Sequence, residues 1–259
     1  MSSRYKSLFS FNDKTVIVTG AASGLGREIA LALADFGADL VIADKNADGL
    51  EAVAEELRPG ARSVLPCTTD VSVPDQVDSM VNAALKVSGH IDALVHCAGI
   101  GGRSPAENYP MDLWDEVISV NAGGTFLCTQ AVGRVMLEQE DGGAIVNLSS
   151  IGGIVGKAGS VGYQVSKAME IQIAKSLGVE WGPHGVRVNS IAPGLFMTET
   201  IRAETDREPD VNAGFMKMLP RGRAGELHEI VGAAIFLASD AGSYVTGAVI
   251  PVDGGALAW

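Results

Sequence analysis

Short apolar runs alternate with longer amphipathic segments along most of the chain. The apolar runs predict seven strands, at residues 14–20, 38–45, 63–71, 90–99, 142–150, 185–194 and 248–255. Near-continuous apolar strands separated by helices are typical of a parallel sheet that is covered on both faces. No linker or repeat divides the sequence, so we expect one doubly wound α/β domain over residues 1–259.

The segments between the strands predict amphipathic helices. In the first helix the apolar positions are Leu25, Ile29, Ala32, Leu33 and Phe36. Gly37 is the expected end of this helix.

Two later helices carry more specific signals. At residues 72–89 the pattern predicts a helix with Ser72 as its N-cap and Pro74 in its first turn. Farther along, it predicts one helix from about Asp112 and a longer helix that follows Asn121.

Composition and charge exclude several classes of function. The 259 residues are 47% hydrophobic and carry a net charge of −12, which argues against general nucleic-acid binding and attachment to anionic membranes. No apolar run approaches the roughly 18 residues of a membrane helix, and the N-terminus lacks the pattern of a signal peptide. Cys67, Cys97 and Cys128 have neither metal-site nor disulfide spacing. We therefore expect a cytoplasmic protein with reduced cysteines and no metal.

A glycine-rich turn follows the first strand. The segment TGAASGLG has GxxxGxG spacing, which allows a sharp turn, a close approach to a pyrophosphate and tight helix packing. The N-terminus of the next helix offers backbone N–H groups to phosphate. We expect a nucleotide to bind at Gly20, Ser23, Gly24, Leu25 and Gly26.

A carboxylate at the end of the second strand predicts which nucleotide binds. Asp44 stands 18 residues after Gly26, where a carboxylate would hold the adenosine ribose diol and repel a 2′-phosphate. The residue before Gly24 is the neutral Ser23, although Lys45 is discordant. The pattern favours NAD(H) over NADP(H); the alternative for Asp44 is a helix-capping role.

Two further strand ends complete the predicted nucleotide edge. Asp70 and Val71 end the third strand, where they would flank an adenine ring. At the end of the fourth strand, the small residues Cys97, Ala98 and Gly99 would let a ribose or nicotinamide lie close.

A Tyr/Lys pair follows the fifth strand. Tyr163 and Lys167 are four residues apart on a predicted helix, so they share one face, and Ser149 and Ser150 end the preceding strand. This arrangement indicates an acid/base site for an alcohol. Alternatively, the serines cap a turn, the tyrosine packs in the core and the lysine is solvated.

Together these motifs resemble the short-chain dehydrogenase/reductase family, in its order and over about residues 9–257. They are TGAASGLG, Asp44, Asp70, CAG, Asn121, Ser150, YQVSK, PG followed by Thr198, and the C-terminal VDGG. The resemblance implies a Rossmann-type fold, a nicotinamide cofactor and hydride transfer to or from a secondary alcohol. It also implies a homotetramer.

The resemblance also implies roles for single residues. Tyr163 would be the acid/base, and Lys167 would hold the nicotinamide ribose and make the tyrosine a stronger acid. Ser150 would orient the substrate oxygen in preference to Ser149, and Asn121 would support a water-linked proton path. Phe196 and Thr198, which follow Pro193 and Gly194 in the sequence, would hold the carboxamide of the nicotinamide.

One motif departs from the family. Where members often have Asn-Asn-Ala-Gly, this chain has His96 and Cys97 before Ala98 and Gly99. We interpret His96 as a structural histidine that replaces one hydrogen bond, and Cys97 as a packing residue.

The substrate side is less specific. We expect an irregular substrate lid at about residues 195–225, and Arg103 and Lys157 as candidate anchors or solvated charges. The sequence looks like that of a sugar, sugar-acid or polyol dehydrogenase. The alternatives are a 3-oxoacyl-thioester reductase and a non-catalytic NAD(H) sensor.

Overall fold

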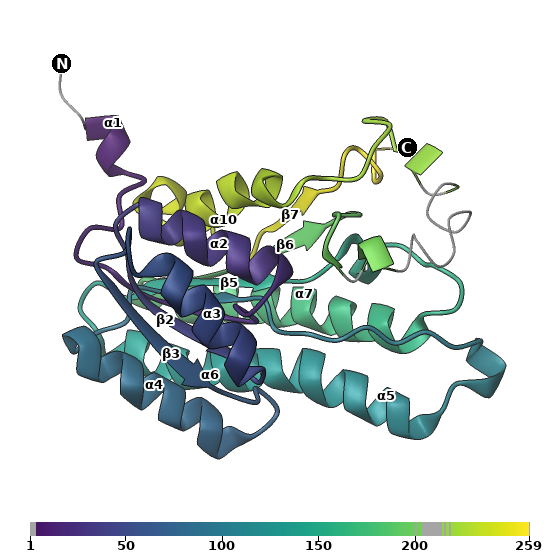
Figure 1. Ribbon diagram of the computed structural model, residues 1–259, viewed down its shortest axis with the longest axis horizontal. Coiled ribbons are helices and arrows are strands. Elements are labelled where there is room, and N and C mark those ends of the chain that lie inside the picture. Colours follow the sequence, from purple (N-terminus) through teal and green to yellow (C-terminus); the bar gives the residue numbers. More distant parts are fainter. Residues whose placement is uncertain (1–3, 200, 204–213, 215, 218, 259) are drawn as a thin grey trace.

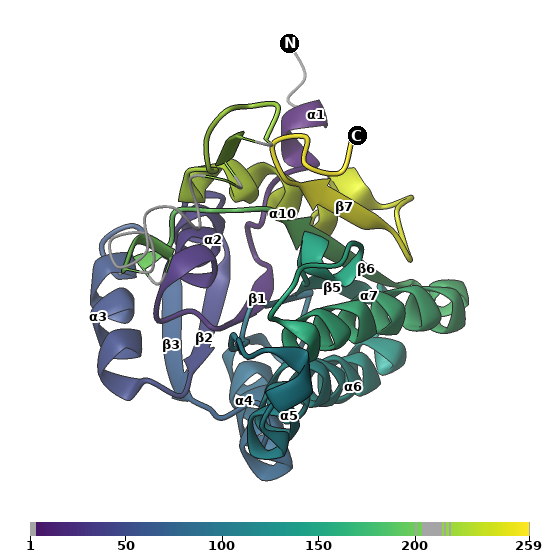
Figure 2. The same cartoon turned by 90° about the vertical axis from the view of Figure 1, so that its right-hand side faces the viewer.

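The computed structural model describes residues 4–199, 201–203, 214, 216–217 and 219–258. These residues form a seven-stranded sheet in the order β3-β2-β1-β4-β5-β6-β7, with every neighbouring pair parallel (Figures 1 and 2). The strands are β1 (Thr15–Thr19), β2 (Asp39–Asp44), β3 (Ser63–Thr68), β4 (Ala93–His96), β5 (Gly143–Leu148), β6 (Val186–Pro193) and β7 (Val249–Val252). The predicted doubly wound α/β sheet is confirmed.

Helices cover both faces of the sheet. The described α-helices are α1 (Arg4–Ser7), α2 (Gly24–Asp35), α3 (Ala47–Leu57), α4 (Pro74–Ser88), α5 (Met111–Val117), α6 (Gly124–Glu138), α7 (Val161–Trp181) and α10 (Val231–Ala238). Short 3-10 turns lie at Ala106–Asn108, Ile151–Gly153, Gly182–His184, Leu227–Ile230 and Asp240–Gly242. Helices α2, α3 and α10 pack on one face, and α4, α6 and α7 on the other (Figures 1 and 2).

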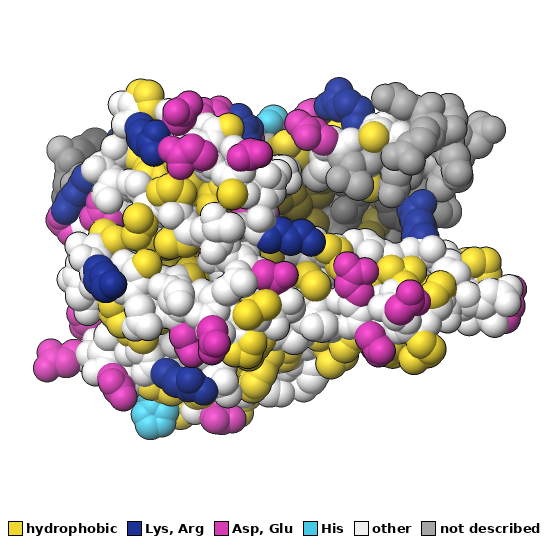
Figure 3. Space-filling model, turned by 60° about the horizontal axis from the view of Figure 1, so that its bottom comes forward, with side chains coloured by type: hydrophobic (Ala, Val, Ile, Leu, Met, Phe, Trp, Pro, Cys, Tyr) yellow, Lys and Arg dark blue, Asp and Glu magenta, His cyan; other side chains and the backbone are white. Residues whose placement is uncertain are grey.

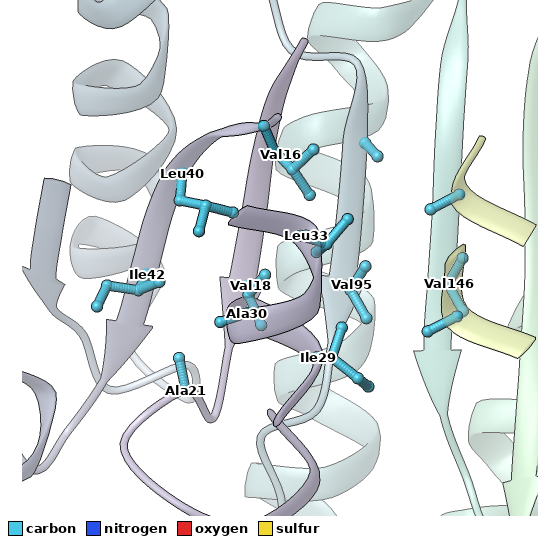
Figure 4. Close-up of a cluster of buried hydrophobic side chains, with 14 of the residues drawn as sticks. Val16, Val18, Ala21, Ile29, Ala30, Leu33, Leu40, Ile42, Val95 and Val146 are labelled. Carbon is cyan, nitrogen blue, oxygen red and sulfur yellow. The ribbon is translucent and has the colours of Figure 1, made fainter. Parts of the chain in front are cut away.

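The central strands are apolar at nearly every position because both of their faces are buried. On β1, Val16 and Val18 point toward Ile29 and Leu33 of α2, as Figure 4 shows. Ile17, between them, belongs to the core on the opposite face. This packing fixes α2 across the sheet, so its N-terminus lies at the carboxyl end of β1.

Two predicted details of the helices are wrong. Phe36 does not lie on the buried face of α2; it is the C-cap residue, 41% exposed, while Ala30 and Ala34 are buried beside Leu33. Ser72 is not the N-cap of α4, because the helix begins one residue later, at Pro74, after Val73. The Ser72 hydroxyl donates instead to Asp70 at 2.6 Å.

The helical segment around Asn121 is continuous. We expect a helix to follow Asn121, whereas the structure has a π-helix over Ile118–Gly123 that joins α5 directly to α6. Such wide turns are frequent at functional sites. Asn121 is fully buried within it.

None of the helices in the described part of the chain is both long and apolar enough to cross a bilayer. The order of the strands places a topological switch point between β1 and β4, where ligands of open α/β sheets bind.

Candidate active site

The loop between β1 and α2 has a backbone that requires glycine. Gly20 has φ +67, and a Cβ there would lie 2.7 Å from the backbone nitrogen of Ala98. A Cβ on Gly26 would collide with the carbonyl oxygen of Gly20, and Gly24 has φ +55. Ser23, the N-cap residue of α2, is extended and its side chain makes no capping hydrogen bond. The loop therefore forms a cradle at the positive end of a helix, as anion binding requires.

Asp44 lies beside this cradle. Its Oδ2 accepts a hydrogen bond from the backbone N–H of Ala22 at 3.1 Å, and its Oδ1 accepts one from Asn46 N–H at 2.9 Å. The N-cap of α3 is Asn46, whose side chain accepts from Gly49 N–H at 3.1 Å. A helix-capping role for Asp44 is therefore wrong, and its carboxylate faces the glycine loop.

Asp70 lies just beyond the end of β3. Its Oδ1 accepts hydrogen bonds from the Ser72 hydroxyl and from Ser72 N–H, which lower the pKa of the carboxyl. The next residue, Val71, is buried and packs against Gly124, where a Cβ would lie 2.6 Å from a Val71 methyl group.

The chain leaving β4 joins the nucleotide edge to the Tyr/Lys helix. Cys97 N–H donates to the carbonyl oxygen of Thr19 at 3.2 Å. Two residues on, a Cβ at Gly99 would lie 3.2 Å from Asn121 Oδ1 and 3.3 Å from Lys167 Nζ. The small residue that we expect beside the cofactor therefore lies against two of the four predicted catalytic side chains.

The side chains of Ser150 and Tyr163 both lie against Gly152. A Cβ at Gly152 would lie 3.4 Å from Ser150 Oγ and 3.7 Å from Tyr163 Cε1. Ser150 Oγ accepts a hydrogen bond from Gly152 N–H at 3.0 Å, which orients it. Ser149 Oγ, by contrast, donates a hydrogen bond to the carbonyl oxygen of Ile191 on the neighbouring strand at 2.9 Å. Of the two serines, Ser150 is the one that lies against the same glycine as Tyr163. Its role toward the substrate stays a prediction.

Lys167 is almost fully buried, so the solvated alternative is wrong. Its Nζ donates to the carbonyl oxygen of Leu148 at 3.1 Å and to the two carboxylate oxygens of Glu170 at 2.8 and 3.0 Å. It also lies 5.7 Å from the centre of the Tyr163 ring. Burial lowers the pKa of Lys167, but Glu170, Tyr163 and Cys97 together outweigh burial, so that this pKa lies above its ordinary value.

Glu170 is the site residue that our sequence reasoning missed. A signal was present: an acidic residue three positions after Lys167, on the helix face that also carries Ile171 and Ala174.

Asn121 connects the loop after β4 to α7. Its Nδ2 donates to the carbonyl oxygen of Ile100 at 3.0 Å and to Ser166 Oγ at 2.9 Å, and its Oδ1 accepts from Ile100 N–H at 2.8 Å. Ser166 Oγ in turn donates to the carbonyl oxygen of Tyr163 at 2.7 Å. The Asn121 amide thus fixes the backbone that carries the tyrosine.

The segment after β6 reaches the glycine loop through Thr198. Pro193 ends β6, and a Cβ at Gly194 would lie 2.7 Å from the Cα of Asp253. Phe196 is buried, and a Cβ at Gly24 would lie 3.6 Å from a Thr198 methyl group. Thr198 therefore borders the cradle, whereas Phe196 packs against Gly225. Much of the predicted lid (residues 200, 204–213, 215 and 218) lies outside the described residues.

His96 and Cys97, at the end of β4, have separate surroundings. His96 Nδ1 and Thr19 Oγ1 are 2.8 Å apart, and Nε2 has no hydrogen-bond partner within the described ranges. Burial lowers the pKa of His96 to about 3, and Lys167 adds to this effect. Burial raises the pKa of Cys97 to about 12. Both side chains are therefore neutral at physiological pH, and neither can serve as a base.

These residues fit a dinucleotide cofactor. The glycines leave a cradle that a Cβ would fill, a helix N-terminus faces it, and the Asp44 carboxylate is held beside it by Ala22 N–H. A bound nicotinamide would supply the hydride chemistry. Beside such a cofactor, the Tyr163 hydroxyl could give or take a proton, Ser150 could orient an alcohol oxygen, and the charge of Lys167 could stabilise a tyrosinate.

Comparison with known proteins identifies the family. A family model described as enoyl-(acyl carrier protein) reductase matches residues 20–256. D-Threitol dehydrogenase of Mycolicibacterium smegmatis is 41% identical over 249 residues, which are 95% of this chain and 94% of that protein. Levodione reductase of Leifsonia aquatica is 39% identical over 254 residues, again 95% and 94%.

A solved structure extends this comparison to the fold. A proposed NAD(P)-dependent gluconate 5-dehydrogenase of Beutenbergia cavernae, with NADP bound at low occupancy, superposes with a TM-score of 0.91 and 34% identity. The match covers 97% of this chain and all of that one (100%). The chain belongs to the short-chain dehydrogenase/reductase family. It is an NAD(P)-dependent oxidoreductase that acts on a CH–OH group.

Proposed function

We propose that this protein is an NAD-dependent dehydrogenase that interconverts a polyol, sugar or sugar acid and the corresponding ketone. One observation carries the proposal: Gly99, at the nucleotide edge, lies against both Asn121 Oδ1 and Lys167 Nζ. This contact joins a dinucleotide cradle to an acid/base pair in one site. The names of D-threitol dehydrogenase and the proposed gluconate 5-dehydrogenase support an open-chain hydroxylated substrate.

We assign the chemical roles to four side chains. Tyr163 transfers the alcohol proton, Ser150 orients the alcohol oxygen, and Lys167 stabilises the tyrosinate and holds the nicotinamide ribose. Asn121 supports the proton path and, through Ser166, the backbone of the tyrosine.

The preference for NAD over NADP rests on Asp44. Its carboxylate is held beside Ala22 of the glycine loop, where it can accept hydrogen bonds from a ribose diol and would repel a 2′-phosphate. Because NADP is bound in the Beutenbergia structure, a test of this preference has to compare NADP with NAD.

The segment around the site offers substrate contacts. Ser104 N–H donates to the carbonyl oxygen of Gly159 at 3.1 Å, so the loops after β4 and β5 lie together. The exposed side chains of Arg103 and Lys157 stand on these two loops and are our candidates for anchoring a substrate carboxylate. The segment at about residues 195–225 is our candidate lid.

The test is a substrate screen with NAD and NADP in parallel, monitored by nicotinamide absorbance at 340 nm. We expect turnover of polyols, sugars or sugar acids with NAD. Turnover only of 3-oxoacyl or enoyl thioesters, or of cyclic diketones such as levodione, would contradict the substrate class. Binding of NADH without turnover of any alcohol or ketone would identify a sensor instead.

We also propose a homotetramer in the cytoplasm. Helices α6 and α7 leave apolar side chains exposed, among them Phe126 (42%), Met169 (42%) and Val179 (79%). Hydrophobic side chains lie between acidic ones on the lower face of the molecule, which comes forward in Figure 3. The three cysteines are free, as suits a reducing compartment. Size-exclusion chromatography with light scattering should give four times the chain mass of 26.8 kDa, and a monomer would contradict the proposal.

A further inference from the structure

Glu170 occupies a position where the helix pattern calls for an apolar residue. The buried stripe of α7 runs through Ser166, Lys167, Ile171 and Ala174, and Glu170 lies within it with only 1% of its surface exposed. Burying a carboxylate is costly unless it is paired. Its partner is the ammonium of Lys167, which it contacts through both oxygens at 2.8 and 3.0 Å.

The pair leaves Lys167 with no N–H to spare. An ammonium has three donors, and the contacts to the two Glu170 oxygens and to the carbonyl oxygen of Leu148 use three. In the proposed function Lys167 must hold the hydroxyls of the nicotinamide ribose. It can do so only by giving up at least one of these three contacts.

The Glu170 carboxylate is the contact that can be released at least cost. The carbonyl oxygen of Leu148 cannot take up a proton near neutral pH, whereas a buried carboxylate that loses its counter-charge can become neutral. Burial already raises the pKa of Glu170 to about 7, although Lys167 lowers it. Withdrawal of the ammonium would raise this pKa further.

We propose that Glu170 is a positioning residue, which holds the Lys167 ammonium in the free protein and takes up a proton when Lys167 turns to a bound nicotinamide cofactor. The inference rests on the proposed role of Lys167. It makes cofactor affinity depend on pH through a residue that does not contact the cofactor.

The other ionisable groups near the pair are Tyr163, Cys97 and His96, and each can be distinguished from Glu170. Tyr163 and Cys97 raise the pKa of Lys167, and Lys167 in turn lowers the pKa of His96. The pKa of His96 is lowered to about 3 and that of Cys97 raised to about 12, so neither exchanges protons near pH 8. A proton taken up by Tyr163 instead would still be taken up in Glu170→Gln.

In the described part of the chain, the elements packed against α7 add no further charge at the pair. Strand β6 carries Arg187, whose guanidinium donates to the carbonyl oxygens of Leu237, Ser239 and Gly242 instead. Helices α5 and α6 also pack against α7, but none of their charged residues contributes to the pKa of Glu170. These residues are Asp112, Asp115, Glu116, Arg134 and Glu138. Within the described ranges, Lys167 is the charged group that acts on Glu170.

Isothermal titration calorimetry of the full-length protein tests the proposal. NADH, or NADPH if only that cofactor binds, is titrated at pH 8 in Tris and in HEPES, whose ionisation enthalpies differ. We expect an uptake of close to one proton per site, which falls toward zero below about pH 6, where Glu170 is already protonated in the free protein. The dissociation constant should rise by up to about tenfold per pH unit above pH 7.

Two variants on the same helix assign the proton. Glu170→Gln should bind NADH with no proton uptake and with a dissociation constant that changes less than about twofold between pH 7 and 8.5. Glu180→Gln, which alters an exposed glutamate of α7, should behave as the wild type. Circular dichroism verifies that Glu170→Gln is folded; if it is not, the pH dependence of uptake in the wild-type protein still decides.

The outcomes separate this inference from the proposed function. Binding of the cofactor with no proton uptake, with release, or with uptake that persists in Glu170→Gln would overturn the role of Glu170 and leave the dehydrogenase intact. Failure of both NADH and NADPH to bind would overturn both.

Discussion

The carboxylate of Asp44, at the end of β2, accepts a hydrogen bond at 3.1 Å from the backbone N–H of Ala22 in the glycine loop after β1. These residues are 22 positions apart in the chain, and the contact fixes a negative charge beside the cradle where we place the adenosine ribose. The proposed preference for NAD over NADP rests on this contact.

Asp44→Ala should therefore weaken discrimination against NADP. Loss of hydrogen bonds to a charged acceptor costs about 1.5–3 kcal/mol, so kcat/KM with NAD should fall about ten- to hundredfold. The value with NADP should rise or stay constant, because the repulsion of a 2′-phosphate is gone. Asp48→Ala, at an exposed position of α3, is the matched control. An unchanged NAD/NADP ratio would refute the assignment of Asp44.

Tyr163→Phe should abolish turnover without abolishing cofactor binding. Removing a general acid/base typically costs about 10²–10⁴-fold in rate, whereas Phe keeps the ring that lies near Lys167. Stopped-flow or steady-state absorbance gives the rate, and NADH fluorescence gives the dissociation constant. Tyr244→Phe, at a fully exposed tyrosine, controls for the substitution itself. Wild-type turnover by Tyr163→Phe would remove the tyrosine from the mechanism.

The adjacent serines should give opposite results. Ser150→Ala should lower kcat/KM by about tenfold or more, since a hydrogen bond to the alcohol oxygen is lost in the transition state. Ser149→Ala loses bonds to the carbonyl oxygen of Ile191 and to Ser190, so it should cost about 1 kcal/mol of unfolding free energy and leave kcat/KM near the wild-type value. Enzyme assays and urea unfolding of both variants measure the two effects. Exchange of the two results would assign the substrate to Ser149.

His96 should make the protein less stable in mild acid. Its pKa is lowered to about 3 in the folded state, against about 6.5 when unfolded, so only the unfolded chain binds this proton between those values. Stability is therefore lost as pH falls below 6.5, by about 1.4 kcal/mol per pH unit for one proton. From pH 7.5 to pH 5 this amounts to about 2 kcal/mol.

Urea unfolding of His96→Asn at these two pH values measures the contribution. The variant should lose about 2 kcal/mol less than the wild type between pH 7.5 and pH 5. His184→Asn, at an exposed histidine, should lose as much as the wild type. Equal losses in His96→Asn and wild type would show that His96 is not the group that destabilises the protein in acid.

Much of the candidate site could be predicted because it lies at one edge of a parallel sheet. The carboxyl ends of parallel strands meet there, so residues such as Gly20, Asp44 and Gly99 converge once their strands are recognised. The predictions that failed concerned the residue at which a helix begins or ends, or the partner of a polar side chain. Ser72 bonds to Asp70 rather than capping α4, because the helix begins at Pro74, one residue later than expected.

The sequence by itself determined the seven strands, the parallel sheet and the spacing of Tyr163 and Lys167, because these follow from periodicity and from the geometry of one helix. Only the tertiary structure decided that Lys167 is buried against Glu170, that Asn121 clamps Ile100 and Ser166, and that Thr19 holds His96. The last two sets of contacts join residues 21 to 77 positions apart. Buried polar groups take the partners that packing brings within reach, and no local pattern specifies those partners.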